Sequence, residues 1–480
     1  MRSPTTLASL ADELRAIVGQ SGVLHAGSDL LVFECDGYQI EKNSPDIAAF
    51  PRSTDEVARV VRAAARYEIP IVPRGAGTSL AGGCLPVGGG LMIVLTRMKR
   101  ILEINLRDRY AVVEPGVVNA WLNQALAGTG YHYAPDPSSQ GACTIGGNVA
   151  TNSGGPHTLK YGVTVNHVLG LEAVLADGRV IQCGGPAEDS PGLDLVGALV
   201  GSEGTLAIVA KIWVRLTRNP QGCRTMLAVY DTIDEATDTI SQIIGAGIIP
   251  AAIEMMDQGI IAAVEQAYHF GFPLDAQAVL LIEVDGLEAG LDAQRDVVAE
   301  LCRQCGARNV QFAADATERQ LLWKSRKQAF GAIGRLSPNY CTQDGVVPRT
   351  KLPHILRRIL AIGEKHRVRI VNVFHAGDGN IHPIILYDER EPGAIERVLQ
   401  ASGEILDECI HCGGSVTGEH GIGVEKIRYM AKMFTADDLA AMEHLRTAFN
   451  PENRLNPCKM LPTAGGCGME QIRPGRRAAL

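Results

Sequence analysis

Two histidines flank an Asp-Gly pair in FHAGDGNIHP, the segment that spans residues 374–383. Asp-Gly is the preferred pair for a two-residue type I′ turn, so this segment is predicted to form a β-hairpin centred between Asp378 and Gly379. In that register His375 lies directly opposite His382, and opposed residues project from the same face with Cβ atoms about 4.5–5.5 Å apart. Two imidazoles placed in this way could share one metal ion, or could be a hydrogen-bonded pair that packs a sheet.

Three glycine-rich loops in the first half of the chain could hold a ligand that carries phosphate. They are RGAGTSLAGG (74–83), PDPSSQGACTIGGN (135–148) and GSEGT (201–205). A pyrophosphate is bound by several backbone N–H groups that turn inward together, and side chains would block that approach. The first loop differs from a nicotinamide-binding fingerprint, because Leu80 stands where the third glycine of G-x-G-x-x-G belongs. Together the loops predict a large phosphate-bearing ligand.

Composition limits the classes of protein to consider. The 480 residues are 46% hydrophobic and 20% charged, an ordinary globular balance that predicts two or three domains. The formal net charge of −8 argues against a nucleic-acid partner. No 18 consecutive residues are apolar, so no transmembrane segment is predicted, and residues 1–19 are typical of an amphipathic helix rather than a signal peptide. Without such a signal, the twelve cysteines indicate reduced thiols in the cytoplasm.

The order of predicted elements divides the chain near residue 220. Residues 1–220 carry the glycine-rich loops between strands and helices, and their core is expected at about 46–218. Residues 221–462 repeat a strand–helix–strand order, which predicts an α+β domain with an antiparallel sheet covered by helices on one side. The last stretch, 463–480, has no periodic pattern and is expected to be a mobile tail.

Two CxxC pairs end long helical patterns. They are Cys302 with Cys305 and Cys409 with Cys412, and each is followed by a glycine that can end the helix. Positions i and i+3 share one helix face, so buried cysteine pairs are the favoured interpretation. A zinc or iron–sulfur site is the alternative, and it would need four close ligands.

Longer motifs resemble known flavoproteins. PRGAGTSLAGG, APDPSSQGACTIGGNVATNSGG and DLVGALVGSEGTLAIV are similar to the FAD-binding domain shared by vanillyl-alcohol oxidase and p-cresol methylhydroxylase. WKSRKQAF, NVFHAGDGNIHP, GGSVTGEHGIGVEK and FNPENRLNP resemble the FAD-linked 2-hydroxy-acid oxidases and dehydrogenases. That family includes the catalytic subunit of glycolate oxidase, together with D-lactate and D-2-hydroxyglutarate dehydrogenases. The motifs stand in the family's order over residues 20–462.

The resemblance implies a two-part FAD-binding domain of the p-cresol methylhydroxylase type, with a noncovalently held FAD whose flavin faces the second domain. Some proteins of this fold attach flavin through a histidine. His157 lies near the second loop, where a solvated or structural histidine is the favoured interpretation. Matching the motifs assigns to FAD the residues Pro73, Arg74, Gly75, Ala76, Gly77, Thr78, Ser79, Gly82, Pro135, Ser138, Ser139, Gly141, Thr144, Gly146, Gly147, Asn152, Gly204 and Ile208.

The same resemblance implies a reaction centre. Oxidation of a 2-hydroxy acid removes the hydroxyl proton and the Cα hydride, and a divalent cation on the hydroxyl oxygen would help the first step. The family motif assigns Glu419 to that metal together with His375 and His382, and assigns His420 to proton abstraction. Imidazole and carboxylate ligands suit zinc, manganese and iron alike. The glycines of this motif permit a sharp turn that could bring ligand and base into one cavity.

The substrate carboxylate needs a cation with planar donors, and arginine provides a two-pronged contact. Arg326 matches the family's carboxylate-binding arginine. Lys324 and Lys327 are competing candidates, and an ordinary solvated charge is the default interpretation for all three. Asn380, at the predicted turn, is expected only to support the site.

These assignments predict FAD-dependent oxidation of a short 2-hydroxy acid, with glycolate to glyoxylate first and D-lactate or D-2-hydroxyglutarate as alternatives. The family implies a glycolate oxidase complex in which a second flavin subunit and an iron–sulfur subunit pass electrons toward quinone. It also implies peripheral association with the membrane through those subunits. Two other classes stay open here: a metal-dependent hydrolase, and a flavin-bearing electron-transfer subunit with no substrate chemistry of its own.

Overall fold

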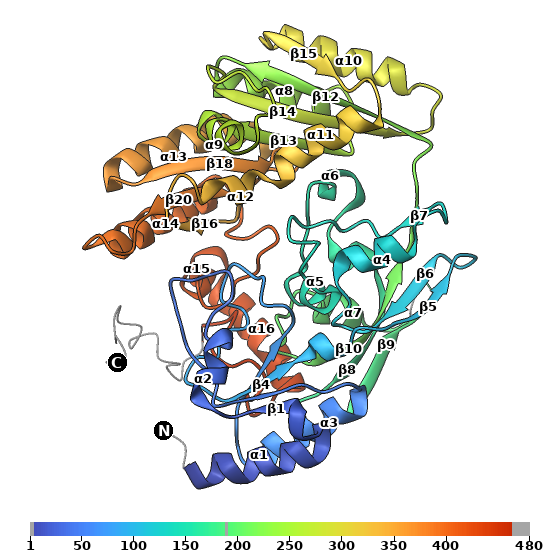
Figure 1. Ribbon diagram of the computed structural model, residues 1–480, viewed down its shortest axis with the longest axis vertical. Helices are drawn as coiled ribbons and strands as arrows, with labels where there is room; N and C mark the ends of the chain where they lie inside the picture. The colour runs from blue at the N-terminus through green and yellow to red at the C-terminus, as the bar shows by residue number, and fades with distance from the viewer. Residues whose placement is uncertain (1–3, 188–190, 463–480) are drawn as a thin grey trace.

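The computed structural model describes residues 4–187 and 191–462, and the expected tail at 463–480 lies outside these ranges. Figure 1 shows an upper part built from the middle of the chain and a lower part built from its two ends. Helices and sheets are mixed in both parts, which confirms the predicted α+β class. Within the described residues, no helix is long and apolar enough to cross a membrane.

The first sheet has four strands in the order β1-β2-β4-β3, with β2, β4 and β3 parallel. Helix α3 begins with an N-cap, because the Glu56 N–H donates to the Ser53 hydroxyl at 3.2 Å. The first glycine-rich loop leaves this sheet at the end of β3. The elements of this layer are α1 (Pro4–Val18), β1 (Val23–Leu24), β2 (Ile47–Ala49), α3 (Thr54–Arg66), β3 (Ile71–Arg74) and β4 (Leu91–Val94).

The second sheet is antiparallel and has the order β5-β6-β10-β8-β9. The Thr144 hydroxyl accepts from the Gly147 N–H at 3.3 Å, and this N-cap ends the second glycine-rich loop by starting helix α5. The elements here are β5 (Ile101–Asn105), β6 (Tyr110–Val113), α4 (Asn119–Ala125), α5 (Ile145–Thr151), α6 (Thr158–Tyr161), β8 (Val168–Val174), β9 (Val180–Gly184) and β10 (Ile208–Arg215).

The third sheet forms the upper part, with the path β15-β12-β14-β13-β18-β19-β17 and with β20 pairing both β18 and β16. The pairings are antiparallel, as predicted. The strands are β12 (Gly222–Tyr230), β13 (Ala252–Asp257), β14 (Ala278–Gly286), β15 (Asn309–Phe312), β16 (Asn339–Thr342), β17 (Gly345–Val346), β18 (Arg369–His375), β19 (Asn380–Ile381) and β20 (Pro383–Tyr387).

Helices cover both faces of this sheet, so the expectation of helices on one side was incomplete. Alternate residues of β12 enter two different cores: Met226 and Ala228 pack with the first helix layer, and Leu227 and Val229 with the second. The first layer contains α8 (Ile233–Gly245), α10 (Leu291–Gln304), α13 (Leu352–His366) and α14 (Ala394–His411). The second contains α9 (Gln258–Tyr268) and α12 (Ala329–Ile333).

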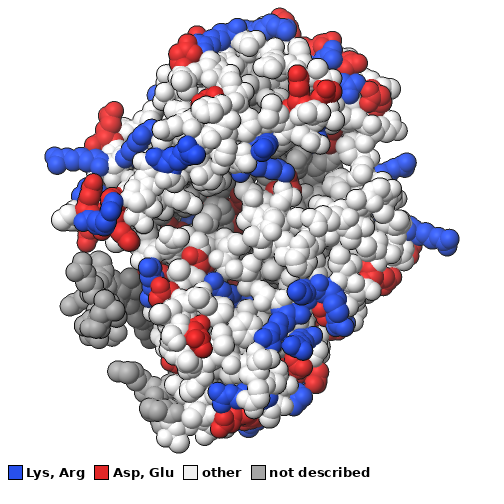
Figure 2. All heavy atoms as spheres, viewed as in Figure 1, with Lys and Arg blue, Asp and Glu red and all other residues white. Residues whose placement is uncertain are grey.

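The end of the described chain returns to the lower part. Helices α15 (Ile427–Met433) and α16 (Ala436–Phe449) lie there in Figure 1. Beyond them, the Ile71 N–H donates to the Arg454 carbonyl at 2.8 Å, and Leu455 is buried in the core beneath α1 and α3. The domain boundary near residue 220 stays a prediction. The returning segment belongs to the second half of the chain but packs on the first sheet. Figure 2 shows that the surface is hollowed where the two parts meet.

The cysteines differ in one respect from the expectation. Among the described residues ten cysteines have free thiols, including both CxxC pairs. Cys458 is disulfide-bonded, so the prediction of reduced thiols is wrong for Cys458. In the CxxC pairs Cys302 and Cys409 are buried. Cys305 and Cys412 are half-buried, so the expectation of buried pairs holds for one cysteine of each pair.

Candidate active site

The hairpin that carries the two histidines has a different register from the predicted one. His375 pairs with Asn380 instead of His382, and four residues, 376–379, connect β18 to β19. The predicted two-residue turn is therefore wrong. Side chains alternate along a strand with a period of two, so a register shift of two residues keeps both histidines on one face. Their ring centroids lie 5.2 Å apart.

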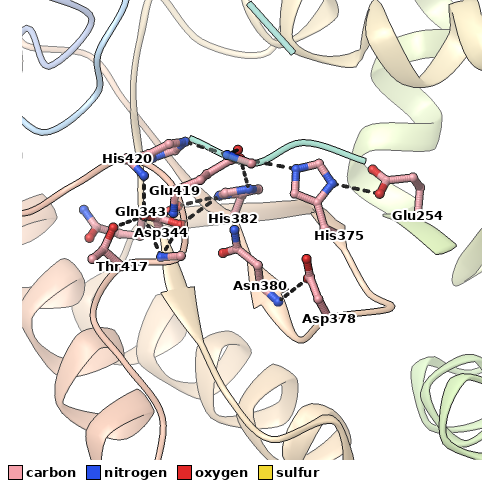
Figure 3. Close-up of polar contacts among 12 residues, drawn as sticks. Glu254, Gln343, Asp344, His375, Asp378, Asn380, His382, Thr417, Glu419 and His420 are labelled. Carbon is pink, nitrogen blue, oxygen red and sulfur yellow. Dashed lines mark hydrogen bonds and ion pairs between the residues drawn. The ribbon is translucent and has the colours of Figure 1, made fainter. Parts of the chain in front are cut away.

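Glu419 joins the two histidines in a buried triad, shown in Figure 3. Its Oε1 atom lies 3.2 Å from His375 Nε2 and 3.1 Å from His382 Nε2. The other ring nitrogens are held from behind: His375 Nδ1 lies 2.8 Å from Glu254 Oε1, and His382 Nδ1 lies 3.2 Å from the Gln343 carbonyl oxygen. Such outer contacts fix the tautomer of a metal-binding histidine and aim its Nε2 atom inward.

The donor set of the triad fits a divalent metal ion. Two imidazoles and one carboxylate leave a fourth position open, which is typical of a catalytic site. Burial alone would raise the pKa of the Glu419 carboxyl, but the contacts with His375 and His382 lower it well below its usual value. This buried carboxylate is therefore stabilised by nearby positive charge, and a divalent cation can supply that charge.

The turn that delivers Glu419 and His420 is built around Asp344, a residue that the sequence analysis missed. The carboxylate of Asp344 is fully buried and accepts from the Thr417 hydroxyl at 2.5 Å. It also accepts from the backbone N–H groups of residues 418–420 at 2.9–3.2 Å. Burial would raise the pKa of Asp344, but the cation of Lys426 at 3.5 Å, first among its charged neighbours, lowers it. Asp344 thus bends the segment so that adjacent side chains reach one cavity.

His420 stacks on His382 with ring centroids 4.9 Å apart and an interplanar angle of 14°. Its Nε2 atom lies 3.9 Å from Glu419 Oε1, so this nitrogen faces the triad. Burial lowers the pKa of His420 to about 4, which leaves the imidazole neutral at neutral pH and able to accept a proton.

All three glycine-rich loops line one cavity of about 360 Å³, here called the main cavity. Fourteen of the eighteen residues assigned to FAD line it: Pro73, Arg74, Gly75, Ala76, Gly77, Thr78, Ser79, Ser138, Ser139, Thr144, Gly146, Gly147, Gly204 and Ile208. Gly82, Pro135, Gly141 and Asn152 are not among the lining residues.

The main cavity fits a dinucleotide in two respects. A Cβ atom on Gly75 would collide with the Thr144 hydroxyl, so the two loops approach each other as closely as they do only because glycine stands there. The Ser79 hydroxyl is buried and has no hydrogen-bond partner among the described residues. A buried donor of this kind is normally satisfied, and a phosphate or sugar oxygen would satisfy it.

The upper part adds six residues to the lining of the main cavity. Three belong to the predicted centre, namely His382, Glu419 and His420. The others are Lys327, Phe330 and Tyr340, of which only Lys327 was a candidate in the sequence. Phe330 ends the motif WKSRKQAF but was given no role there, and no motif marks Tyr340; both reach the cavity through tertiary packing.

Arg326 lies behind this wall and not in it. It is on α11 (Ala316–Lys327), is 1% exposed, and its Nη2 atom lies 2.6 Å from Glu254 Oε2. Glu254 therefore links Arg326 to His375. The Arg326 Nε atom is buried with no hydrogen-bond partner among the described residues, so one donor of the guanidinium is still available.

His157 lies where the two parts meet and does not line the main cavity. Its Nδ1 atom is 2.8 Å from Asp136 Oδ2 and its Nε2 atom is 3.6 Å from Glu283 Oε1. The ring also stacks on Trp323 at 5.2 Å. These contacts are those of a polar interface.

Comparisons with known proteins agree with this geometry. The FAD binding domain family matches residues 45–184, and the C-terminal domain of FAD linked oxidases matches residues 219–460. The chain is 43% identical to glycolate oxidase subunit GlcD of Escherichia coli (strain K12), over 95% of this chain and 91% of that protein. It is 40% identical to GlcD of Bacillus subtilis (strain 168), over 94% and 96%. It is 30% identical to a probable mitochondrial D-lactate dehydrogenase of Danio rerio, over 94% and 91%.

Among solved structures, p-cresol methylhydroxylase with substrate bound superposes with a TM-score of 0.81 at 18% identity, covering 95% of this chain and 97% of that one. At that identity the likeness shows the fold alone. It confirms the predicted p-cresol methylhydroxylase type of architecture.

Proposed function

We propose that the chain oxidises glycolate to glyoxylate. The premise is that it belongs to the FAD-linked oxidases and is an FAD-dependent 2-hydroxy-acid oxidoreductase. D-lactate is the second candidate substrate, because a D-lactate dehydrogenase is among its relatives, and D-2-hydroxyglutarate is the third. The observation that carries the proposal is that His382, Glu419 and His420 line the same cavity as the three FAD loops. A site for the substrate's hydroxyl group and a site for the cofactor therefore share one space.

Each residue of the centre has a proposed part in the reaction. His375, His382 and Glu419 hold a divalent ion, which when bound makes the substrate hydroxyl more acidic, while FAD when bound accepts the hydride from Cα. His420 takes the hydroxyl proton at Nε2, the ring nitrogen that faces the triad. Lys327, which lines the cavity, binds the substrate carboxylate, while Arg326 acts from behind the wall through its ion pair with Glu254. The half-buried ring of Phe330 gives the cavity wall an apolar surface beside the more exposed Tyr340.

Flavin reduction tests this proposal directly. The purified, FAD-loaded protein is mixed without oxygen with glycolate, with each lactate enantiomer or with D-2-hydroxyglutarate, and loss of the visible flavin absorption is followed. We expect the fastest bleaching with glycolate and much slower bleaching after a chelator has removed the metal. Bleaching by none of these acids, in flavin-loaded protein, would favour an electron-transfer subunit.

Phe330 should limit the size of the substrate. We expect Phe330→Ala to shift the ratio of kcat/KM for D-lactate over glycolate about tenfold toward D-lactate, because removing the half-buried ring makes room for the extra methyl group. Phe312→Ala is the matched control, since this half-buried ring packs on the core of the upper part, away from the cavity. Steady-state kinetics on both acids measures the ratio, and an unchanged ratio in Phe330→Ala would show that another wall sets the size.

The relatives named as subunits support a complex, and we propose that a second flavin subunit and an iron–sulfur subunit carry the electrons toward quinone. The described part of the chain has one group of possible metal ligands that includes a cysteine, Cys412 with His354 and Glu408. Three such ligands do not make a four-cysteine cluster site, and we propose that the iron–sulfur centre belongs to a partner. The proposed location is the cytoplasm, with peripheral membrane association through these partners.

A further inference from the structure

The segment 417–423 carries both Glu419 and His420 but has no regular secondary structure. Its backbone N–H groups are satisfied mainly by two buried carboxylates that come from opposite sides. Asp344 of the upper part holds residues 418–420, as described above. Glu203 of the lower part holds the two residues that follow Gly421.

Glu203 stands in the third glycine-rich loop and lines the main cavity. Its Oε1 atom accepts from the Ile422 N–H at 2.6 Å, and its Oε2 atom accepts from the Gly423 N–H at 2.8 Å. The residue is 5% exposed and has a φ of +52°, a backbone conformation that is uncommon outside glycine. Both carboxylate oxygens are therefore committed to a segment 219 and 220 residues away in sequence.

The segment is shaped to fit against the lower part. Gly421 has a φ of +85°, and a Cβ atom there would lie 2.7 Å from Glu203 Oε1. Gly423 has a φ of +54°, and a Cβ atom there would collide with the Ala81 carbonyl oxygen. The Val424 N–H also donates to Ala81 O at 3.0 Å. These approaches are too close for any other residue type, so the contact with the lower part is built in by sequence.

A second contact from the lower part reaches the proposed metal ligand itself. The Gly154 N–H donates to Glu419 Oε2 at 3.2 Å, while Oε1 of the same carboxylate faces the two histidines. The triad is thus completed by groups from both parts of the molecule. Outer contacts of this kind control how tightly a metal is held.

We infer that Glu203 is a positioning residue for the reaction centre: it holds the segment 417–423 in register with the main cavity and thereby helps to set the affinity of the triad for a divalent metal. The part of this inference that concerns metal affinity rests on the proposed function. The part that concerns how Glu203 holds the segment does not depend on a metal. Glutamine at position 203 can present one acceptor oxygen but must turn its NH₂ group toward the second N–H donor. We call the two hydrogen bonds from the Ile422 and Gly423 N–H groups to Glu203 the clamp. In Glu203→Gln one of these two hydrogen bonds is lost.

The experiment compares Glu203→Gln with Glu114→Gln. Glu114 is a buried carboxylate of the same part, 3% exposed, and accepts from the Arg100 backbone N–H without touching the segment. Hydrogen exchange is first followed on peptides covering 417–423 in FAD-loaded, metal-free protein. We expect the Ile422 and Gly423 amides to exchange about tenfold faster in Glu203→Gln and at the wild-type rate in Glu114→Gln. Unchanged exchange in Glu203→Gln overturns the clamp whether or not a metal binds.

Metal affinity is the second readout. Zn²⁺ is titrated against a coloured chelator, with Cys412→Ser added to every protein because Cys412, His354 and Glu408 could bind a further ion at the surface. We expect about a tenfold weaker affinity in Glu203→Gln at equal flavin content, and less than about a twofold change in Glu114→Gln. Wild-type affinity in Glu203→Gln, or a loss that disappears when flavin contents are matched, contradicts the inference. Should the wild-type triad bind no Zn²⁺, the proposed metal role fails, and hydrogen exchange still decides the clamp.

Discussion

Flavin reduction by the 2-hydroxy acid should slow about 10²–10⁴-fold in His420→Gln, the range that general-base catalysis contributes. Glutamine keeps roughly the length of the side chain and its place beside His382, but its amide cannot take up a proton at neutral pH. The neutral imidazole that faces the triad is the group that this substitution removes. Stopped-flow measurement of flavin bleaching under anaerobic conditions gives the rate without interference from later electron transfer.

Two controls separate the base from other roles of His420. His132→Gln changes a histidine of the lower part that bonds to Asn219 and does not line the main cavity, so its rate should match wild type. Flavin and metal contents of His420→Gln should also match wild type, because His420 lies beside the triad without being one of its ligands. A His420→Gln protein that keeps more than a tenth of the wild-type rate would place the base elsewhere in the cavity.

The sequence predicted which side chains gather at the centre better than it predicted how they gather. His375 and His382 were expected to meet through a two-residue turn at Asp378-Gly379, whereas four residues form the connection and His375 pairs with Asn380. The local preference of Asp-Gly lost to the pairing of β18 with β20 and of β19 with β17, which sets the register from both sides. The histidines still share a face because the error was an even number of residues.

Three buried carboxylates were missed for a common reason. Each of Glu203, Glu254 and Asp344 acts on residues that lie far away in sequence, and the third glycine-rich loop, which contains Glu203, gives no sign of this role. Glu254 was open to detection, since a carboxylate within the otherwise apolar strand AAIEMMD must find a partner once it is buried. Asp344 and Glu203 gave no such signal, because acidic residues next to glycine are ordinary in exposed turns.

The glycine-rich loops were easier to place than the wall that faces them. A phosphate-binding loop needs small residues close together in sequence. Most of the residues that the family resemblance assigned to FAD line the main cavity. Phe330 and Tyr340 come from α12 and β16 of the upper part, where Phe330 is half-buried and Tyr340 is 41% exposed. Their position at the cavity depends on how the two parts dock, which no short pattern encodes.

Glu419→Gln should weaken the affinity of the triad for a divalent metal by more than about 100-fold, which exceeds the loss expected from an outer contact. The carboxylate is the one anionic ligand in the set, and its Oε1 atom lies within 3.2 Å of both imidazoles. Glutamine preserves the size and can still accept at one oxygen, but it removes the charge that favours a cation. Turnover of Glu419→Gln should fall to the level of chelator-treated wild type. Added Zn²⁺ or Mn²⁺ should restore turnover in the chelator-treated wild type but not in the variant.

A graded series makes this prediction sharp. Glu254→Gln alters the group behind His375 Nδ1 and should weaken metal affinity by about 10–100-fold, less than Glu419→Gln. Glu408→Gln alters the surface group with His354 and Cys412 and should leave both the metal at the triad and turnover unchanged. The three variants make the same chemical change at increasing distance from the triad. The metal affinity that is retained should therefore be lowest in Glu419→Gln, higher in Glu254→Gln and highest in Glu408→Gln. Full metal content in Glu419→Gln would show that the catalytic ion is not bound by the triad. Loss of both metal and turnover in Glu408→Gln would show that the ion is bound by the outer helices instead.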